Sequence, residues 1–182
     1  MIARRLARLR VPLGFVSGVI VLWLARPTPT TLALGIPVAV AGEMLRLWAA
    51  GHLNKSREVT SSGPYRWFAH PLYVGSSVMA AGLAIASASV AVAALIAAYL
   101  SVTLTAAIRS EEAFLRQAFG DRYERYRAGR STSGVDARRR FSFAQARANH
   151  EPRAMAGVLA AVLLLILKAA YNGAFWRAAA GP

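Results

Sequence analysis

The chain has 182 residues, of which 56% are hydrophobic and 16% are charged, and its formal net charge is +14. This length suits one domain, and the composition excludes an ordinary soluble domain or a disordered chain, since soluble domains average about 45–50% apolar and about 25% charged residues. The sequence has no cysteine, which excludes disulfides and thiolate metal sites, and with three histidines no metal site is expected.

The first apolar segment, residues 11–25, follows a basic N-terminus and stops before Pro27 and Pro29. It predicts a retained membrane helix that the prolines end. A signal peptide is the alternative, and the lack of small residues at a cleavage position just past the segment disfavours it.

Three further apolar segments bring the predicted number of membrane-spanning helices to five, in an all-α polytopic fold. Residues 31–52 form the second span, and residues 154–176 form the last, so that an additional C-terminal helix covers about residues 153–177. Residues 71–108 contain no charge, and as one helix they would be about 57 Å long, nearly twice the hydrocarbon core. They therefore predict a tight helical hairpin, with its break at Ser87-Ala88-Ser89.

The basic residues predict the orientation of this single integral-membrane domain, residues 1–182. Residues 1–10, 51–70 and 109–153 hold 18 of the 22 lysines and arginines. By the positive-inside rule these pieces and the N-terminus are cytoplasmic, in the inner or plasma membrane of a cell. Residues 128–152 form a basic cytoplasmic loop near anionic lipid headgroups. The membrane accounts for the charge, so no nucleic acid is expected as a partner.

Polar residues inside a membrane span are costly, and Glu43 and Arg46 lie three positions apart on one face of the second span. Two interpretations remain open for them. They form an ion pair that helps two helices pack, or they stand on the cytoplasmic wall of a ligand cavity.

The loop that begins at Gly63-Pro64 leads into the hairpin through His70 and Pro71. Proline suits the first turn of a helix, which puts His70 at or near the N-cap. Gly75 would let another helix or a ligand approach the backbone. Tyr73 follows as a surface or site residue, and interfacial positions are expected for Tyr65, Trp67 and Phe68.

The fourth span continues as a charged, amphipathic cytoplasmic helix up to Gly120. Glu111 and Glu112 point about 100° apart on it and so cannot do the same job. Local pairing with Arg109 and Arg116 is the simplest role for the two carboxylates. An apolar stripe on this helix and the next can lie on the membrane, formed by Ala113, Leu115, Ala118, Phe119, Tyr123 and Tyr126.

These motifs occur in a recognisable order over residues 40–127. Leu45-Arg-Leu-Trp-Ala49 is followed by Gly63-Pro-Tyr-Arg, His70-Pro-x-Tyr-x-Gly75, an apolar hairpin and Glu111-Glu112. The order and spacing resemble the isoprenylcysteine carboxyl methyltransferase and phospholipid methyltransferase superfamily of integral-membrane enzymes.

The resemblance implies a methyltransferase core over residues 40–127 that uses S-adenosylmethionine. The acceptor would be a lipophilic or prenylated small molecule with a carboxylate, amine or thiol, reached from the membrane lipids, and no obligate protein partner is implied. The residues that would bind the cofactor are Tyr65, His70, Pro71, Tyr73, Gly75, Glu111 and Glu112. Those expected to act on the acceptor are Glu43, Arg46 and Arg109.

One position departs from the family pattern. Ala69 stands where the motif usually carries an arginine before His-Pro, and Arg66 or Arg109 would have to replace that cation. Two alternatives therefore stay open beside the methyltransferase. One is a sterol-type membrane reductase that uses NADPH, and the other is a non-catalytic membrane protein that keeps the scaffold.

Overall fold

The computed structural model describes residues 18–55, 58–129 and 139–179, and within these ranges the fold is all-helical. Residues 18–24 are helical, so the start of the predicted first span lies outside the described residues. The remaining elements, in chain order, are α2 (Pro29–Ala50), the 3-10 helix η1 (Gly63–Arg66), α3 (Pro71–Ser87), α4 (Val90–Phe119), α5 (Asp121–Arg127), α6 (Phe143–Ala148), α7 (Glu151–Tyr171) and α8 (Ala174–Ala179).

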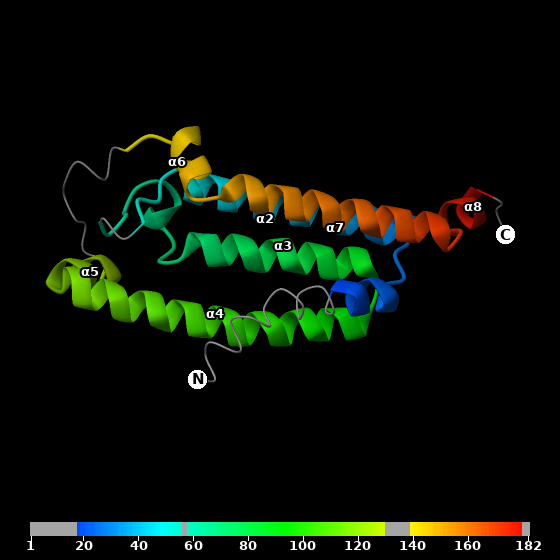
Figure 1. Ribbon diagram of the computed structural model, residues 1–182, viewed down its shortest axis with the longest axis horizontal. Helices are drawn as coiled ribbons and strands as arrows, with labels where there is room; N and C mark the ends of the chain where they lie inside the picture. Colours follow the sequence, from blue (N-terminus) through cyan, green and yellow to red (C-terminus); the bar gives the residue numbers. More distant parts are fainter. Residues whose placement is uncertain (1–17, 56–57, 130–138, 180–182) are drawn as a thin grey trace.

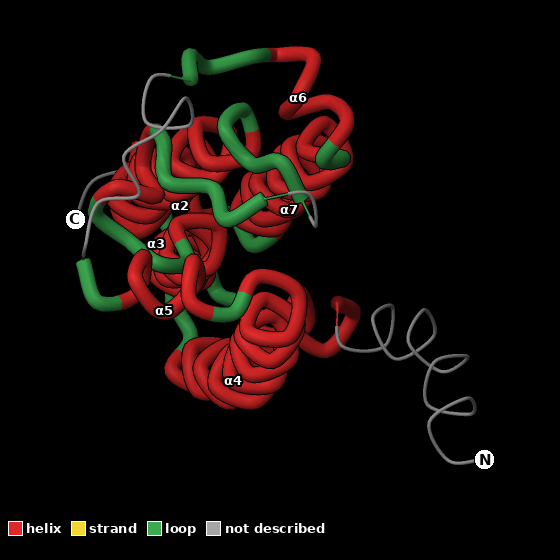
Figure 2. The backbone as a smooth tube through the Cα atoms, turned by 90° about the vertical axis from the view of Figure 1, so that its left-hand side faces the viewer, coloured by secondary structure: helices red, strands yellow, loops and turns green. Residues whose placement is uncertain are grey.

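Four helices run side by side along the long axis of the molecule (Figure 1). Helix α3 contacts α2, α4 and α7, and α7 also packs on α2, an arrangement visible end-on in Figure 2. Helices α5 and α6 and the loop after α2 gather at one end, and α8 lies at the other (Figure 1).

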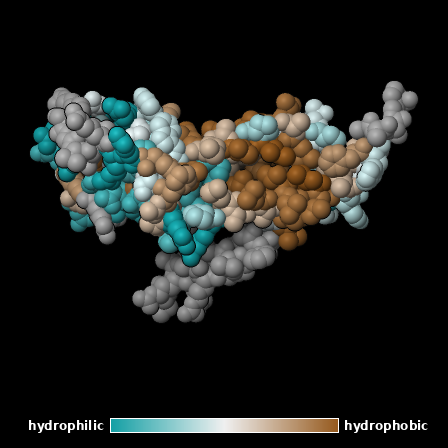
Figure 3. All heavy atoms as spheres, turned by 90° about the horizontal axis from the view of Figure 1, so that it is seen from above, coloured by the Kyte–Doolittle hydropathy of each residue, from teal (hydrophilic) through white to brown (hydrophobic). Residues whose placement is uncertain are grey.

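Three of these helices, α2, α4 and α7, are long and apolar enough to cross a membrane, which confirms three of the predicted spans. Helix α3 is apolar but shorter, at 17 residues. Figure 3 shows apolar residues gathered over the middle and right of the bundle, while hydrophilic residues cover the left end. An apolar band next to a polar end is the surface expected of a membrane protein.

The predicted break in the apolar hairpin is confirmed. Helix α3 ends at Ser87, Ala88 adopts the left-handed conformation with φ of 51°, and the Ser89 side chain accepts a hydrogen bond from the Val92 N–H. A serine at the N-cap satisfies one of the free N–H groups of the new helix. Helix α4 then continues without interruption to Phe119, as the sequence predicts.

The antiparallel helices α2 and α3 meet through two pairs of glycines. A Cβ added to Gly42 would lie 2.7 Å from the Gly75 carbonyl oxygen, and one added to Gly82 would lie 2.6 Å from the Gly35 carbonyl oxygen. Neither contact leaves room for a methyl group, because the two backbones touch directly. Small residues allow this approach, which is how membrane helices gain packing energy without a hydrophobic driving force.

We predict that Gly42→Ala destabilises the protein, by about 1–3 kcal/mol or more, because the added methyl group separates two rigid backbones. Thermal unfolding in detergent measures the effect. The control is Gly157→Ala on α7, where an added Cβ meets nothing within 4 Å. The control should be neutral or slightly stabilising, since alanine favours a helix more than glycine does. An equal loss in both variants would contradict this account of the α2–α3 contact.

Candidate active site

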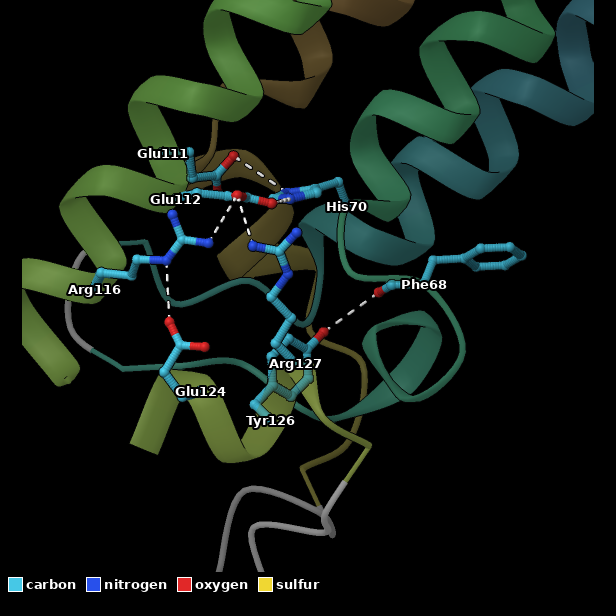
Figure 4. Close-up of polar contacts among 8 residues, drawn as sticks. All are labelled: Phe68, His70, Glu111, Glu112, Arg116, Glu124, Tyr126 and Arg127. Carbon is cyan, nitrogen blue, oxygen red and sulfur yellow. Dashed lines mark hydrogen bonds and ion pairs between the residues drawn. The ribbon is translucent and has the colours of Figure 1, made fainter. Parts of the chain in front are cut away.

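His70 lies at the centre of a carboxylate cluster between α3 and α4. As predicted, it is the N-cap residue of α3, followed by Pro71 in the first turn. Its Nδ1 atom lies 3.6 Å from Glu111 Oε2, and its Nε2 atom lies 3.5 Å from Glu112 Oε1 (Figure 4). The two adjacent glutamates point in different directions, and each meets a different nitrogen of the one imidazole.

Glu112, unlike Glu111, also forms ion pairs with two arginines. Its Oε2 atom lies 3.0 Å from Arg127 Nη1 and 3.4 Å from Arg116 Nη2. Arg116 in turn donates to Glu124, at 3.0 Å (Figure 4). These contacts join α4 to α5, and they require the chain to reverse at Gly120, whose φ of 44° is a conformation that glycine adopts without strain.

The return of α5 corrects one expectation from the sequence. Tyr123 and Tyr126 do not extend an apolar stripe along the membrane, since Tyr123 is buried and the Tyr126 hydroxyl donates to the Tyr65 carbonyl oxygen at 2.8 Å. It also lies 3.3 Å from the Phe68 carbonyl oxygen (Figure 4). A continuous apolar stripe requires one uninterrupted helix. The chain instead reverses at Gly120, and α5 packs on the loop that precedes α3.

A cavity of about 850 Å³ lies between these elements. Four residues predicted to bind the cofactor line it, namely Tyr65, His70, Tyr73 and Glu111. Its apolar lining comes mainly from Leu53, Val59, Leu72, Ala107, Phe114 and Leu115. A volume of this size is typical of small-molecule sites, which combine apolar walls with a few polar groups.

Three predicted cofactor residues are not among those that line the cavity. Glu112 holds the far nitrogen of His70, and Pro71 is buried at the start of α3. Gly75 faces α2, where a Cβ would meet the Gly42 carbonyl oxygen and the side chain of Arg46. For Gly75 the helix-packing alternative therefore describes its surroundings.

The residues expected to act on the acceptor also lie outside the cavity lining. Arg109 is exposed on α4. The Arg46 Nε atom lies 2.9 Å from Glu151 Oε1 of α7 and 3.4 Å from Glu43 Oε2, and its guanidinium group also contacts Ser76 of α3. The ion pair expected between Glu43 and Arg46 is present, and it is part of a cluster that joins three helices. Whether these residues take part in a reaction stays a prediction.

The sequence analysis missed several cavity residues, among them Lys55, Asn149 and His150. Lys55 lines the cavity, whereas the proposed replacement cations, Arg66 and Arg109, do not. Asn149 and His150 also line it, from the turn between α6 and α7. No local signal points to them, because they lie in the basic loop, far along the chain from the motifs.

Residues 139–150 form a strap, as we call this segment, over the loop after α2. The Asn149 Nδ2 atom donates to the Ala50 and Leu53 carbonyl oxygens, at 2.8 Å each, and Gln145 Nε2 donates to the same Leu53 oxygen at 2.7 Å. The Arg139 side chain pairs with Glu58 further along the loop. The strap thus fixes one wall of the cavity.

The cluster shifts the pKa values of groups at this end of the bundle. The pKa of His70 is raised from its ordinary value of 6.5, first because of the Glu111 carboxylate beside its ring, while burial opposes the shift. Burial raises the pKa of the Tyr126 hydroxyl to about 12 and that of Tyr65 further still. The tyrosines therefore stay neutral at physiological pH, and the carboxylates favour a protonated His70.

We predict that His70 makes the stability of the protein depend on pH. Because the pKa of His70 is raised in the folded state, protonation of His70 favours folding. This stabilisation is fully present below pH 6.5, and it is lost as the pH rises through the raised pKa. The melting temperature, measured from about pH 5 to about pH 9, should fall across this window in the wild type. His70→Gln should lack that step, and identical pH profiles would refute the assignment.

We also predict that Asn149→Ala loosens the loop after α2. The variant loses two hydrogen bonds of about 0.5–1.5 kcal/mol each and leaves two carbonyl oxygens without that donor. Hydrogen–deuterium exchange should therefore rise at residues 51–55. Gln117→Ala, a change of an exposed amide on α4, is the matched control and should leave exchange there unaltered. Unchanged exchange in Asn149→Ala would mean that the strap does not hold the loop.

These features define an all-helical membrane protein with a cavity at the polar end of its bundle. The chain belongs to the phospholipid methyltransferase family, whose sequence profile matches residues 30–122. This membership confirms the resemblance seen in the ordered motifs, and it indicates a membrane methyltransferase. The matched region contains His70, Glu111 and Glu112, whereas the strap and α7 lie beyond it.

Two curated relatives are similar to the same extent. The nickel-cobalt-cadmium resistance protein NccN of Alcaligenes xylosoxydans xylosoxydans is 35% identical over 99 residues, which cover 53% of this chain and 45% of the relative. The cobalt-zinc-cadmium resistance protein CzcN of Cupriavidus metallidurans is 35% identical over 99 residues, 53% of this chain and 44% of the relative. The chain thus spans about half the length of these relatives. No solved structure matches it.

Proposed function

We propose that this protein transfers a methyl group from S-adenosylmethionine to a lipophilic acceptor at the cavity beside His70. The observation that carries the proposal is the imidazole held between Glu111 and Glu112, on the edge of a cavity of about 850 Å³. All three residues lie within the segment that matches the methyltransferase family.

The residues present fit such a cofactor. S-adenosylmethionine carries an ammonium group and ribose hydroxyls, which a carboxylate such as Glu111 can accept in charge-assisted hydrogen bonds. His70 lines the same cavity, and its ring is oriented by the two glutamates. Tyr65 and Tyr73 offer aromatic faces, which attract a cation by about 0.5–2 kcal/mol.

Lys55 supplies the cation that Ala69 lacks in this proposal. The carboxylate of the cofactor, or an anionic acceptor, needs a positive partner, and Lys55 is one of the residues that line the cavity. Lysine binds such a group as a point charge and not as the two-pronged donor that arginine provides. The substitution at position 69 is therefore compatible with binding, with a different geometry around the anionic group.

When bound, the cofactor supplies an electrophilic methyl group on a sulfonium. The work of this chain is to position the acceptor and to exclude water. The Tyr126 hydroxyl fixes the backbone at Tyr65 and Phe68, and the Asn149 amide fixes the loop after α2, so both walls of the cavity are held by hydrogen bonds.

The acceptor we propose is carried by a lipid-like molecule. Leu72, Phe114 and Leu115 line the cavity, and the apolar surfaces of α3 and α4 continue from them along the bundle. A carboxylate acceptor needs no base, whereas an ammonium acceptor must first lose a proton. We still propose that Glu43, Arg46 and Arg109 act on the acceptor, although none of them lines the cavity.

Calorimetric titration of the detergent-purified protein with S-adenosylhomocysteine tests the proposal, with NADPH as the comparison ligand. We expect micromolar binding of S-adenosylhomocysteine alone. His70→Ala and Glu111→Gln should each weaken it at least tenfold, about 1.4 kcal/mol, because each removes a polar partner from the cavity. Asp121→Asn, which neutralises an exposed carboxylate on α5, should bind as the wild type does.

The other outcomes separate the alternatives. Binding of NADPH alone would support the membrane reductase. A folded protein that binds neither ligand would support the non-catalytic scaffold, with the loss of arginine at position 69 as its explanation. Wild-type affinity in both site variants would refute the site while leaving the cofactor in place.

A further inference from the structure

A second cavity, of about 690 Å³, lies at the opposite end of the bundle from His70. It is formed where the link before α2 meets the end of α7 and the start of α8, on the right in Figure 1. Ala25, which lines it, also belongs to a buried apolar cluster with Leu32, Leu165 and Ala169. The cavity is therefore built by several elements that pack against one another.

Two basic side chains line this cavity, Arg26 and Lys168, and no acidic residue does. They come from segments far apart in the sequence. Among the side chains that the structure describes, no other lysine or arginine lies at this end of the bundle. The rest lie toward the end that carries α5 and α6 or, like Arg46, within the bundle. The convergence of these two cations in one hollow indicates a site for an anion.

The position of the cavity along the bundle matches the level of lipid headgroups. Lys168 lies about 26 Å along α7 from its first residue, Glu151, close to the thickness of a hydrocarbon core of about 30 Å. Trp23 and Tyr171 also line the cavity and are 76% and 87% exposed. Exposed tryptophan and tyrosine are enriched at the membrane interface.

The surroundings favour a lipid over a soluble anion. Directly before Lys168, α7 presents Leu163, Leu164 and Leu167, which are exposed in the protein and offer a surface for acyl chains. A phosphate held by Arg26 and Lys168 would leave its acyl chains along α7, where Leu164 lies one turn before Lys168 on the same face. Arginine is suited to this task because its planar guanidinium group can hold two phosphate oxygens at once.

We propose that this cavity binds the phosphate headgroup of an anionic phospholipid between Arg26 and Lys168. The ligand joins the segment before α2 to the end of α7, two parts of the chain that lie on either side of the region shared with the family. The site is separate from the cavity at His70 and does not depend on the proposed methyltransferase activity.

Native mass spectrometry of the full chain tests the proposal. The probes are phosphatidylglycerol, phosphatidylcholine and inorganic phosphate, each added to the delipidated protein. We expect phosphatidylglycerol to bind in preference to phosphatidylcholine, and millimolar phosphate neither to bind measurably nor to displace it. The double variant R26Q/K168Q should weaken phosphatidylglycerol binding at least tenfold, and R26K/K168R should retain it.

A matched double variant, R66Q/R153Q, removes two exposed arginines from the other end of the molecule and should bind phosphatidylglycerol as the wild type does. If R26Q/K168Q fails to fold, the single variants R26Q and K168Q carry the test, and each should weaken binding. Undiminished binding in these variants, or equal binding of the two lipids, would overturn the proposal. Displacement of the lipid by millimolar phosphate would assign the cavity to a soluble anion instead.

Discussion

The direct contact between the backbones of α2 and α3 is the constraint on which the rest of the structure depends. Gly42 faces Gly75 and Gly35 faces Gly82, so the two helices lock in one antiparallel register. That register sets Arg46 of α2 beside Ser76 of α3, and the α2–α3 pair is the surface on which α7 packs. It also fixes the start of α3, where His70 meets the glutamates of α4. In a membrane such contacts replace the hydrophobic effect as the source of packing energy.

The candidate active site is assembled from short polar segments at the end of an apolar bundle. The outermost ion pair, Arg116–Glu124, joins two exposed side chains, and such pairs contribute less than about 1 kcal/mol each. Their arrangement as a network is what matters, since Glu112 holds His70 and Arg127 at once and Arg116 extends the chain of contacts to Glu124. The network keeps α5 folded back, which in turn supplies the hydroxyl of Tyr126 to the loop before α3.

The cavity combines a part shared with the family and a part built by the C-terminal segment of this chain. The family profile covers residues 30–122, which provide His70, Glu111 and most of the apolar lining. The strap adds Asn149 and His150 to the lining and holds the loop that carries Lys55. The cavity wall thus depends both on the region that matches the family and on a segment beyond it.

The sequence by itself determined the features that follow from neighbouring residues. The apolar segments, the hairpin break at residues 87–89 and the N-cap at His70 depend on interactions within a turn of helix. Ordered motifs also identified the family and the pair Glu111-Glu112. The tertiary structure alone decided that Gly75 faces a helix, that Tyr126 turns back, and that Lys55 and His150 line the cavity. Those contacts depend on how each helix is rotated and where the chain reverses, and no periodicity along one segment encodes which distant segment it will meet.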